Sequence, residues 1–488
     1  MKVSIVTEGF QNTGYGHITR CLALYQAFNA RDISTTMYVN GDNNSSQILR
    51  NTYHEIIDWM NDRELLYSKL RTSNIIIVDS YLADKEFYES IFPLTQYPVF
   101  IDDNRRLEFP HGIILNGSIY GESMNYPSPK EGSNLLGAKY IPLRNEFWDV
   151  PDKTVRLDIN SVLITFGGQD IRNLTPRILR SLSRNYPSLK KNVVIGNGFT
   201  NIDQINEAKD KNTILHYAPD ASMMLQLMLE ADAAITAAGQ TIYELARIGV
   251  PTIAIAVVDN QLNSMAGWFK EDFLIDNINY LNPNLEHKIL LSFSNLQKRP
   301  VRERLSKLGR QKVDGGGAKR VVQALIDQIA APFGFYLRRA SEKDASLILN
   351  LSNDRVVRAN SINQNPISWN EHIVWYNDKI RDINTLFLLA FNRNDGFIGQ
   401  VRFDINDTSA SINISIDKEF RGKGFSKSLI FTTSFKLLKE YPEVSTIKAY
   451  IRPQNTPSIK AFSKAGYVQA PDELINNEKF LVYIMARQ

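Results

Sequence analysis

The chain has 488 residues, of which 43% are hydrophobic and 22% are charged, and this length favours about three domains of ~150 residues each. The net charge is only +4 and the Lys and Arg residues are scattered, which argues against nucleic acid as a partner. The single cysteine, Cys21, excludes an intramolecular disulfide and a zinc site built from cysteines, and no apolar run is long enough to form a signal peptide or to span a membrane. We therefore expect a cytoplasmic protein without a membrane partner, in which Cys21 packs among the apolar residues of a helix.

The first predicted strand, residues 3–6, runs into a glycine turn and an amphipathic helix. The turn is Gly14-Tyr15-Gly16-His17, and Arg20 lies one helical turn further on. Glycines let the backbone approach a ligand closely, and the N–H groups at a helix start favour an anion. His17 can exchange a proton near neutral pH. The pattern is consistent with a catalytic anion site, and also with a simple turn that carries a capping or surface histidine.

Short apolar runs then alternate with helical patterns. The runs at 75–78, 99–101 and 112–115 are typical of strands buried on both faces of a parallel sheet. Each ends at polar residues, which at the carboxyl ends of such strands line a ligand crevice. These residues are Asp79, Asp102, Asp103 and Asn116.

The same pattern restarts at residues 161–166, which run into Gly167-Gly168, and it continues with apolar runs at 193–196, 233–236 and 252–255. The sequence thus predicts two Rossmann-like domains, residues 1–150 and 151–330, with a cleft between them. Residues 147–153 would join the two domains.

A third domain is predicted over residues 334–488, after Pro332 and Gly334 interrupt a helix. Its strands at 397–403 and 410–416 alternate apolar and polar residues, which is typical of antiparallel pairing with one wetter face. The expected fold class is therefore α/β, with two Rossmann-like domains followed by an α+β domain.

A second phosphate-binding turn is predicted at the start of the helix that follows residues 233–236. Gly239, Gln240 and Thr241 would present backbone N–H groups to a diphosphate, with Gly168 approaching from the preceding crossover. Glu244, one turn into the helix, could accept hydrogen bonds from a ribose. The alternative is that these residues form an ordinary helix cap and that Glu244 only stabilises the helix dipole.

These motifs together resemble the glycosyltransferase-B (GT-B) superfamily, and more narrowly the UDP-2,4-diacetamido-2,4,6-trideoxy-β-L-altropyranose hydrolases of pseudaminic acid biosynthesis. The resemblance covers residues 1–330 and includes Asp79-Ser80-Tyr81 and Asp259-Asn260-Gln261. It implies that His17 is the base that activates water, with Tyr81 and Asn260 near the sugar. The implied UDP-sugar contacts are Gly14, Tyr15, Gly16, Arg20, Gly168, Gly239, Gln240, Thr241, Glu244 and Gln261. Gln240 departs from the Gly or Ser of many relatives.

The chemistry of such a hydrolase is consistent with these residues. Cleavage of the anomeric C–O bond leaves negative charge on UDP, which amides and a helix N-terminus can stabilise without a metal. Water delivered from the opposite face would invert the anomeric centre. We expect no metal: Asp102 and Asp103 are adjacent on an extended segment and point to opposite sides, so hydrogen bonds to the backbone or the sugar are favoured over a shared cation.

The third domain also contains a glycine-rich turn between a strand and a helix, residues 419–429. A capped helix is predicted within residues 455–467. Successive amides there form a nest for a diphosphate, flanked by basic residues. Both segments resemble the GNAT acetyltransferases, which implies acetyl-CoA as cosubstrate. The implied contacts are Ile416, Arg421, Gly422, Lys423, Gly424, Phe425, Ser426, Asn455, Ser458 and Phe462.

Two residues depart from the GNAT pattern. Ser426 replaces a Gly or Ala but keeps its amide, and Phe462 replaces a Tyr that protonates the CoA thiolate in many members. That proton would then come from water or another residue. His372 is a possible base for the acceptor amine, or a residue on a helix surface.

The two resemblances predict a bifunctional enzyme. It would N-acetylate a UDP-4-amino-4,6-dideoxy-2-acetamido sugar and then hydrolyse the product to UDP and the free sugar. One alternative is a GT-B transferase fused to an acyltransferase that modifies a surface polysaccharide. A second alternative is a nucleotide-sugar binding module, against which the presence of His17 argues.

Overall fold

A computed structural model describes residues 1–11, 14–129 and 133–487. The chain divides into two compact units. The N-terminal unit comprises Val3–Arg31 and Thr35–Val322, and the C-terminal unit comprises Met1–Lys2, Asp32–Ser34 and Gln323–Gln488. Across the described ranges, no helix has the length and apolar character needed to cross a membrane.

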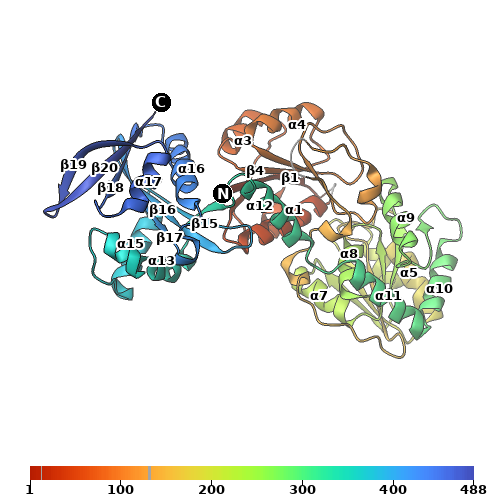
Figure 1. The fold of residues 1–488 in the computed structure, drawn as a ribbon. Coiled ribbons are helices and arrows are strands. Elements are labelled where there is room, and N and C mark those ends of the chain that lie inside the picture. Colours follow the sequence, from red (N-terminus) through yellow and green to blue (C-terminus); the bar gives the residue numbers. More distant parts are fainter. Residues whose placement is uncertain (12–13, 130–132, 488) are drawn as a thin grey trace. The chain divides into compact units, whose positions relative to one another are not determined.

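The N-terminal unit contains two sheets (Figure 1). The first has the strand order β3-β2-β1-β4-β5-β6-β7. Its strands are β1 Lys2–Gly9, β2 Ser34–Gly41, β3 His54–Ile56, β4 Ile75–Asp79, β5 Tyr97–Ile101, β6 Ile113–Asn116 and β7 Leu135–Leu136. Its helices are α1 Gly16–Asn29, α2 Asn43–Ile48, α3 Arg63–Leu70 and α4 Lys85–Ile91.

The second sheet has the order β10-β9-β8-β11-β12-β13, and its neighbouring strands pair in parallel. Its strands are β8 Ser161–Thr165, β9 Lys190–Ile195, β10 Thr213–Tyr217, β11 Ala233–Ala237, β12 Thr252–Ala256 and β13 Ile278–Asn279. Its helices are α5 Leu174–Asn185, α6 Ile202–Ala208, α7 Ala221–Glu230, α8 Thr241–Ile248, α9 Leu262–Lys270, α10 Leu285–Leu296 and α11 Arg299–Lys312. Helix α12, Gly317–Ala330, follows.

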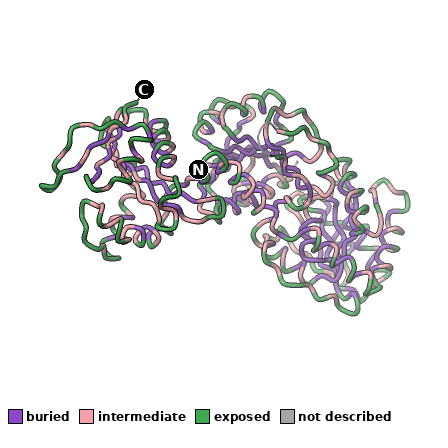
Figure 2. Tube along the Cα trace, viewed as in Figure 1, coloured by how far each residue is buried: buried purple, intermediate pink, exposed green. Residues whose placement is uncertain are grey.

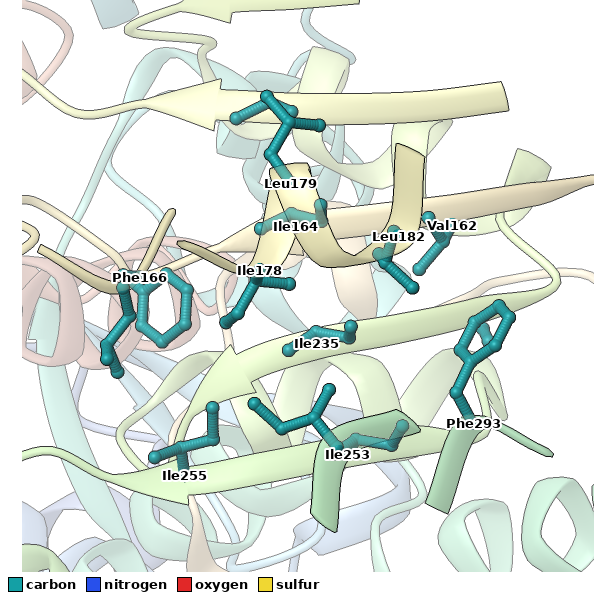
Figure 3. Packing of buried hydrophobic residues seen from close by; sticks show 14 of the residues in the cluster. Val162, Ile164, Phe166, Ile178, Leu179, Leu182, Ile235, Ile253, Ile255 and Phe293 are labelled. Atoms are coloured by element: carbon teal, nitrogen blue, oxygen red, sulfur yellow. The ribbon is translucent and has the colours of Figure 1, made fainter. Parts of the chain in front are cut away.

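The central strands are buried on both faces. Val162 and Ile164 of β8 pack with Ile178 of α5 in one cluster (Figure 3). Leu163, between them, belongs to a second cluster. Figure 2 shows the buried residues concentrated along the sheets. This packing explains the uninterrupted apolar runs of these strands.

The strand orders locate the ligand crevice of each sheet. In a doubly wound sheet the order reverses at a switch point, and ligands bind outside the carboxyl ends of the strands there. The switch point lies between β1 and β4 in the first sheet and between β8 and β11 in the second. The segments that follow β1, β8 and β11 carry His17, Gly168 and Gly239, and Asp79 is the last residue of β4.

The C-terminal unit contains a sheet of order β14-β15-β16-β17-β18-β20-β19. Its strands are β14 Tyr336–Arg339, β15 Thr385–Phe391, β16 Phe397–Asn406, β17 Ser409–Ile416, β18 Thr446–Ile451, β19 Val468–Ile475 and β20 Glu478–Ala486. Its helices are α13 Ala345–Ser352, α14 Arg355–Asn360, α15 Trp369–Arg381, α16 Phe425–Glu440 and α17 Thr456–Lys464. The neighbouring strands pair antiparallel except for β17 and β18, which run in parallel.

Strands β17 and β18 separate along their length. They pair only from Ser409 to Ser411 on β17 and from Thr446 to Lys448 on β18. The remainder of β17, residues 412–416, has no registered partner on that side, so a gap opens toward the carboxyl ends of the two strands.

The predicted α/β class is confirmed in its coarse form: two sheets with the strand order of a doubly wound fold are followed by a largely antiparallel sheet. The GT-B arrangement and the three domain boundaries remain predictions.

Candidate functional site

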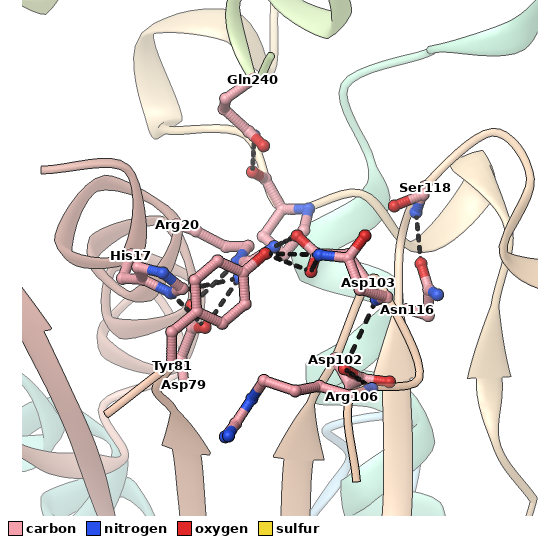
Figure 4. Close-up of polar contacts among 12 residues, drawn as sticks. His17, Arg20, Asp79, Tyr81, Asp102, Asp103, Arg106, Asn116, Ser118 and Gln240 are labelled. Atoms are coloured by element: carbon pink, nitrogen blue, oxygen red, sulfur yellow. Dashed lines mark hydrogen bonds and ion pairs between the residues drawn. The ribbon is translucent and has the colours of Figure 1, made fainter. Parts of the chain in front are cut away.

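His17 and Asp79 form a hydrogen-bonded pair at the switch point of the first sheet, in which Asp79 is buried and His17 is partly exposed (Figure 4). His17 lies in the first turn of α1, and Asp79 is the last residue of β4. The Nδ1 atom of His17 is 2.6 Å from Oδ1 of Asp79. Within the part of the chain that is described, the Nε2 atom of His17 has no hydrogen-bond partner. A carboxylate at Nδ1 selects the tautomer that leaves the Nε2 lone pair available to a substrate or water.

The charges around this pair shift both pKa values. Burial disfavours the imidazolium, but the charge and hydrogen bond of Asp79 outweigh it and raise the pKa of His17 above 6.5. Burial would raise the pKa of Asp79, yet Arg20 and His17 together hold it far below its usual range. Asp79 is therefore a fixed anion that makes His17 a stronger base.

The pair belongs to a closed ring of five side chains. The Arg20 guanidinium donates to both carboxylate oxygens of Asp79, at 2.8 and 2.7 Å, and to Oδ2 of Asp103 at 3.2 Å. The Tyr81 hydroxyl donates to Oδ1 of Asp103 at 2.5 Å. The Tyr81 ring meets the His17 ring edge to face, with 4.5 Å between centroids. Such a network holds each member in one orientation, as a preorganised active site requires.

A cavity of about 150 Å³ lies beside this ring and is lined from both sheets. It brings together six of the predicted site residues: Arg20, Tyr81, Gly239, Gln240, Asn260 and Gln261. His17 does not line this cavity but contacts Tyr81, which does. Gly14, Tyr15, Gly16, Gly168, Thr241 and Glu244 also lie outside its lining.

The predicted glycine turns border open space. A Cβ atom added at Gly14, Gly16, Gly167 or Gly168 would meet no atom of the described residues within 4 Å. The loop after β1 contacts the loops after β8 and β9. The Gln11 carbonyl accepts from Nε2 of Gln169 in the loop after β8, and Nε2 of Gln11 donates to the Asn197 carbonyl, after β9, at 3.5 Å. The two turns thus face free volume in one unit, as close approach by a ligand requires.

This geometry yields a test of the Gly168 turn. Gly168 does not adopt a left-handed φ, so we expect Gly168→Val to leave the free energy of unfolding almost unchanged. A steric conflict of about 1–3 kcal/mol with bound phosphates would weaken UDP binding roughly five- to hundredfold. Calorimetric titration with UDP, alongside urea denaturation, measures both quantities. If the folded variant binds UDP with the parental affinity, Gly168 does not contact bound UDP.

The residues of the second predicted turn are partly engaged within the protein. Glu244 is buried, and its Oε1 accepts from Arg144 at 2.9 Å. Gln240 donates to the Pro142 carbonyl at 3.1 Å, and Gln261 accepts from the Val257 amide at 3.0 Å. The ribose role of Glu244 remains a prediction, and its bond to Arg144 joins α8 to the segment that follows the first sheet.

Several residues at the site were not assigned a role by the sequence. The sequence predicts Asp79 and Asp103 as polar residues at strand ends but gives neither a role beside His17. Their position at the carboxyl ends of buried strands is the signal that points to both. Glu8 is buried, and its Oε1 accepts from the Tyr81 amide at 2.6 Å. This bond fixes the start of the segment that follows β4 and carries Tyr81. Asn104 donates to the Tyr81 hydroxyl at 2.9 Å. No pattern in the sequence singled out Glu8 or Asn104.

Asp102 accepts hydrogen bonds from protein groups, as expected, and the Cys21 thiol donates to Oδ2 of Asp79 at 3.7 Å. Asp102 accepts from the Arg105 amide at 2.7 Å and from the Tyr126 hydroxyl at 2.5 Å, whereas Asp103 turns toward Tyr81. Cys21 is buried. Over the described ranges, no group of three or more His, Cys, Asp or Glu side chains is arranged to hold a metal.

In the C-terminal unit, the loop after β17 presents its backbone to solvent. Gly422 and Gly424 are exposed, have φ values of 76° and 87°, and would place a Cβ in open space. The first amides of α16 follow Gly424 and have no intrahelical acceptors. This cradle suits the diphosphate of acetyl-CoA. Phe425 and Ser426 in this first turn are partly buried, and the Ile416 carbonyl lies at the end of β17.

The basic side chains of this loop differ in how far protein groups hold them in place. Arg421 donates from Nε to the Ile416 carbonyl at 2.9 Å and from one terminal nitrogen to Oδ1 of Asp354 at 2.6 Å. Lys423 is exposed, with its Nζ 5.2 Å from the centroid of the Phe420 ring. Arg421 is thus already positioned by protein groups, which sequence reasoning did not anticipate.

The second predicted acetyl-CoA segment begins with a capped helix. Oδ1 of Asn455 accepts from the Ser458 amide at 3.3 Å at the start of α17. Phe462 is buried and packs against Tyr467, whose hydroxyl contacts Ser434 at 2.7 Å. A buried phenyl ring supplies packing rather than a proton at this position.

His372 lies in the interior, so its interpretation as a helix-surface residue is wrong. It is 1% exposed, and its Nε2 is 2.8 Å from the Ala345 carbonyl. Burial lowers the pKa of His372. Its contact with Ala345 holds α15 against α13, and this enclosed position does not support a role as base.

Residues 335–468 match the family model of the acetyltransferase (GNAT) domain. The whole chain is similar to an uncharacterized protein of Methanocaldococcus jannaschii, with 24% identity over 96% of each chain. It is also 25% identical to the spore coat polysaccharide biosynthesis protein SpsG of Bacillus subtilis, over 67% of this chain and 98% of that protein. A third relative is the pseudaminic acid cytidylyltransferase and UDP-2,4-diacetamido-2,4,6-trideoxy-β-L-altropyranose hydrolase of Helicobacter pylori. The identity is 25%, over 54% of this chain and 46% of that protein.

Proposed function

We propose that the protein is a bifunctional nucleotide-sugar enzyme. Its C-terminal unit N-acetylates the amine of a UDP-4-amino-4,6-dideoxy-2-acetamido sugar, and its N-terminal unit hydrolyses the product to UDP and the free diacetamido sugar. The observation that carries the proposal is the His17–Asp79 pair beside a cavity lined from both sheets, in a chain whose residues 335–468 match the acetyltransferase (GNAT) domain. The similarity to the Helicobacter pylori hydrolase supports it.

In the hydrolytic step, neutral His17 takes a proton from water at Nε2 while Asp79 holds Nδ1–H. The water oxygen forms a bond to the anomeric carbon, and the electron pair of the breaking C–O bond moves to the UDP phosphate. The amides at the start of α8 stabilise that charge. Asp79 then stabilises the imidazolium that has formed.

For acetyl transfer, the exposed amides around Gly422 and Gly424 hold the diphosphate of acetyl-CoA. Acetyl-CoA supplies an activated acetyl group as a thioester. The gap between β17 and β18 leaves residues 412–415 of β17 without a strand partner on that side, so their backbone groups can hydrogen-bond to the cofactor. Because Phe462 has no hydroxyl, the proton for the thiolate comes from water or another side chain.

Mass spectrometry of reaction products tests the two activities separately. The protein is incubated with UDP-4-amino sugars of the L-altro and D-gluco types, with and without acetyl-CoA. We expect acetylation of one of them only with acetyl-CoA, followed by release of UDP and free sugar in water. Retention of the UDP-sugar bond after acetylation would contradict the hydrolase assignment. We further expect UDP release to persist in EDTA, because no step uses a metal.

The similarity to SpsG supports a second candidate, a transferase of polysaccharide synthesis with an acyltransferase attached. The two candidates differ in the acceptor. A hydrolase releases UDP in buffer alone, whereas a transferase requires a glycan acceptor for the same rate.

The shifted pKa of His17 predicts a pH dependence. Because the neutral imidazole is the base, kcat/KM for hydrolysis should rise with pH through an apparent pKa above 6.5. The stability from the His17–Asp79 pair has the opposite sign: it is complete below 6.5 and is lost as pH rises through the raised pKa of the folded state. Rate profiles and urea denaturation from pH 5 to 9 measure both. If kcat/KM rises with an apparent pKa at or below 6.5, Asp79 does not raise the pKa of His17 as the structure indicates.

A further inference from the structure

The carboxylate of Asp354 joins two segments of the C-terminal unit. Its Oδ1 accepts from the Val356 and Val357 amides at 3.0 and 3.2 Å, which caps the start of α14. The same oxygen accepts from Arg421 of the acetyl-CoA loop at 2.6 Å. Asp354 and Arg421 are both only partly exposed, so this ion pair is stronger than one at a free surface.

A second arginine holds the other end of the same segment. Arg452 is buried and donates to the Ser361 carbonyl at 2.9 Å and to the Ile362 carbonyl at 3.3 Å. Arg452 directly follows β18 and shortly precedes Asn455, the start of the second predicted acetyl-CoA segment.

These contacts place residues 354–362, here called the strap, across the open end of the gap in the sheet. Arg421 lies beyond the carboxyl end of β17 and Arg452 beyond that of β18. The two strands run in parallel and separate toward these ends. A segment fastened to both arginines therefore spans the mouth of the gap beside the cofactor loop.

We propose that Asp354 is a positioning residue for acetyl-CoA: it holds Arg421 ready for the diphosphate and so couples cofactor binding to order in the strap. Two N–H groups of Arg421 are used, by Ile416 and Asp354, and the guanidinium keeps further N–H groups for phosphate oxygens. Because the Arg421 side chain is already held in place, less conformational entropy is lost when it binds the cofactor. This inference rests on the proposed acetyl-CoA site.

Calorimetric titration of the full-length protein with CoA tests the coupling. Asp354→Asn keeps an N-cap oxygen but removes the charge that holds Arg421, so helix α14 still begins correctly. We expect it to weaken CoA binding about two- to tenfold. In an Arg421→Gln background, the same substitution should have no further effect. Asp382→Asn is the matched control, because Asp382 caps a turn through the Asn384 amide in the same unit.

Hydrogen exchange of the strap provides a readout that does not depend on catalysis. CoA should slow exchange in residues 354–362 of the parent, and this protection should be lost in Asp354→Asn. Three results would each overturn this inference without touching the proposed acetyl transfer. The first is equal weakening of CoA binding by Asp354→Asn in both backgrounds, and the second is unchanged or tighter CoA binding in Asp354→Asn. The third is hydrogen exchange in the strap that CoA does not change. A parent protein that binds no CoA would overturn the proposed acetyl transfer as well.

Discussion

Replacing His17 should abolish sugar release while leaving acetyl transfer intact. In His17→Ala the Nε2 base is lost, and loss of a general base typically lowers the rate about 10²–10⁴-fold. Asp79→Asn should have a comparable effect, because an asparagine amide donates to Nδ1 and selects the wrong tautomer, a change that costs about 10⁴-fold in a serine protease. UDP release from an acetylated UDP-sugar measures the first activity, and CoA thiol release in the presence of a UDP-amino sugar measures the second.

An exposed histidine in the same unit supplies the control. His111→Asn removes an imidazole outside the ring of His17, Asp79, Arg20, Asp103 and Tyr81, so both rates should stay at the parental level. Urea denaturation of His17→Ala separates loss of chemistry from loss of structure, since Arg20 still pairs with Asp79 in that variant. Near-parental UDP release from folded His17→Ala would refute the assignment of the base.

The sheet strands could be predicted because their signal is local. A strand buried on both faces must be apolar at successive residues, so residues 75–78 and 252–255 were recognised without any knowledge of their partners. The alternation in residues 410–416 likewise predicted antiparallel pairing, which β17 makes with β16. Strand order and the gap between β17 and β18 depend on contacts between distant segments, and no local pattern encodes them.

The site was predictable only as far as its residues belong to motifs. The motif around His17 identified the candidate base, but its pairing with Asp79 joins residues 62 positions apart. The same limit applies to Glu244, which a helix-start pattern suggested for a ribose and which the fold brings to Arg144, 100 positions away. Arg421 was predicted as a cofactor contact, whereas its partner Asp354 could not be inferred from spacing. Motifs therefore suggest which groups serve chemistry, and the fold decides which other groups hold them.

A carboxylate at residue 424 should abolish acetyl-CoA binding and acetyl transfer without affecting hydrolysis. Gly424 has a φ of 87° and lies at the start of α16, where we place the CoA diphosphate. In Gly424→Asp the negative charge repels the phosphates at close range and competes for the same amides. We expect CoA binding to fall below detection by calorimetry. Hydrolysis of an already acetylated UDP-sugar should continue at the parental rate, because the proposed hydrolytic residues belong to the N-terminal unit.

Gly424→Asn separates charge from backbone strain in this experiment. Asn and Asp are the residues that best tolerate a left-handed φ, so both variants carry a similar conformational cost, about 1–2 kcal/mol. The asparagine variant has nearly the same volume as the aspartate but no charge, and it should retain measurable though weakened CoA binding. If Gly424→Asp binds CoA as well as Gly424→Asn does, the diphosphate is not held at the start of α16. If hydrolysis falls together with acetylation in a folded Gly424→Asp protein, the two chemistries do not occupy separate units.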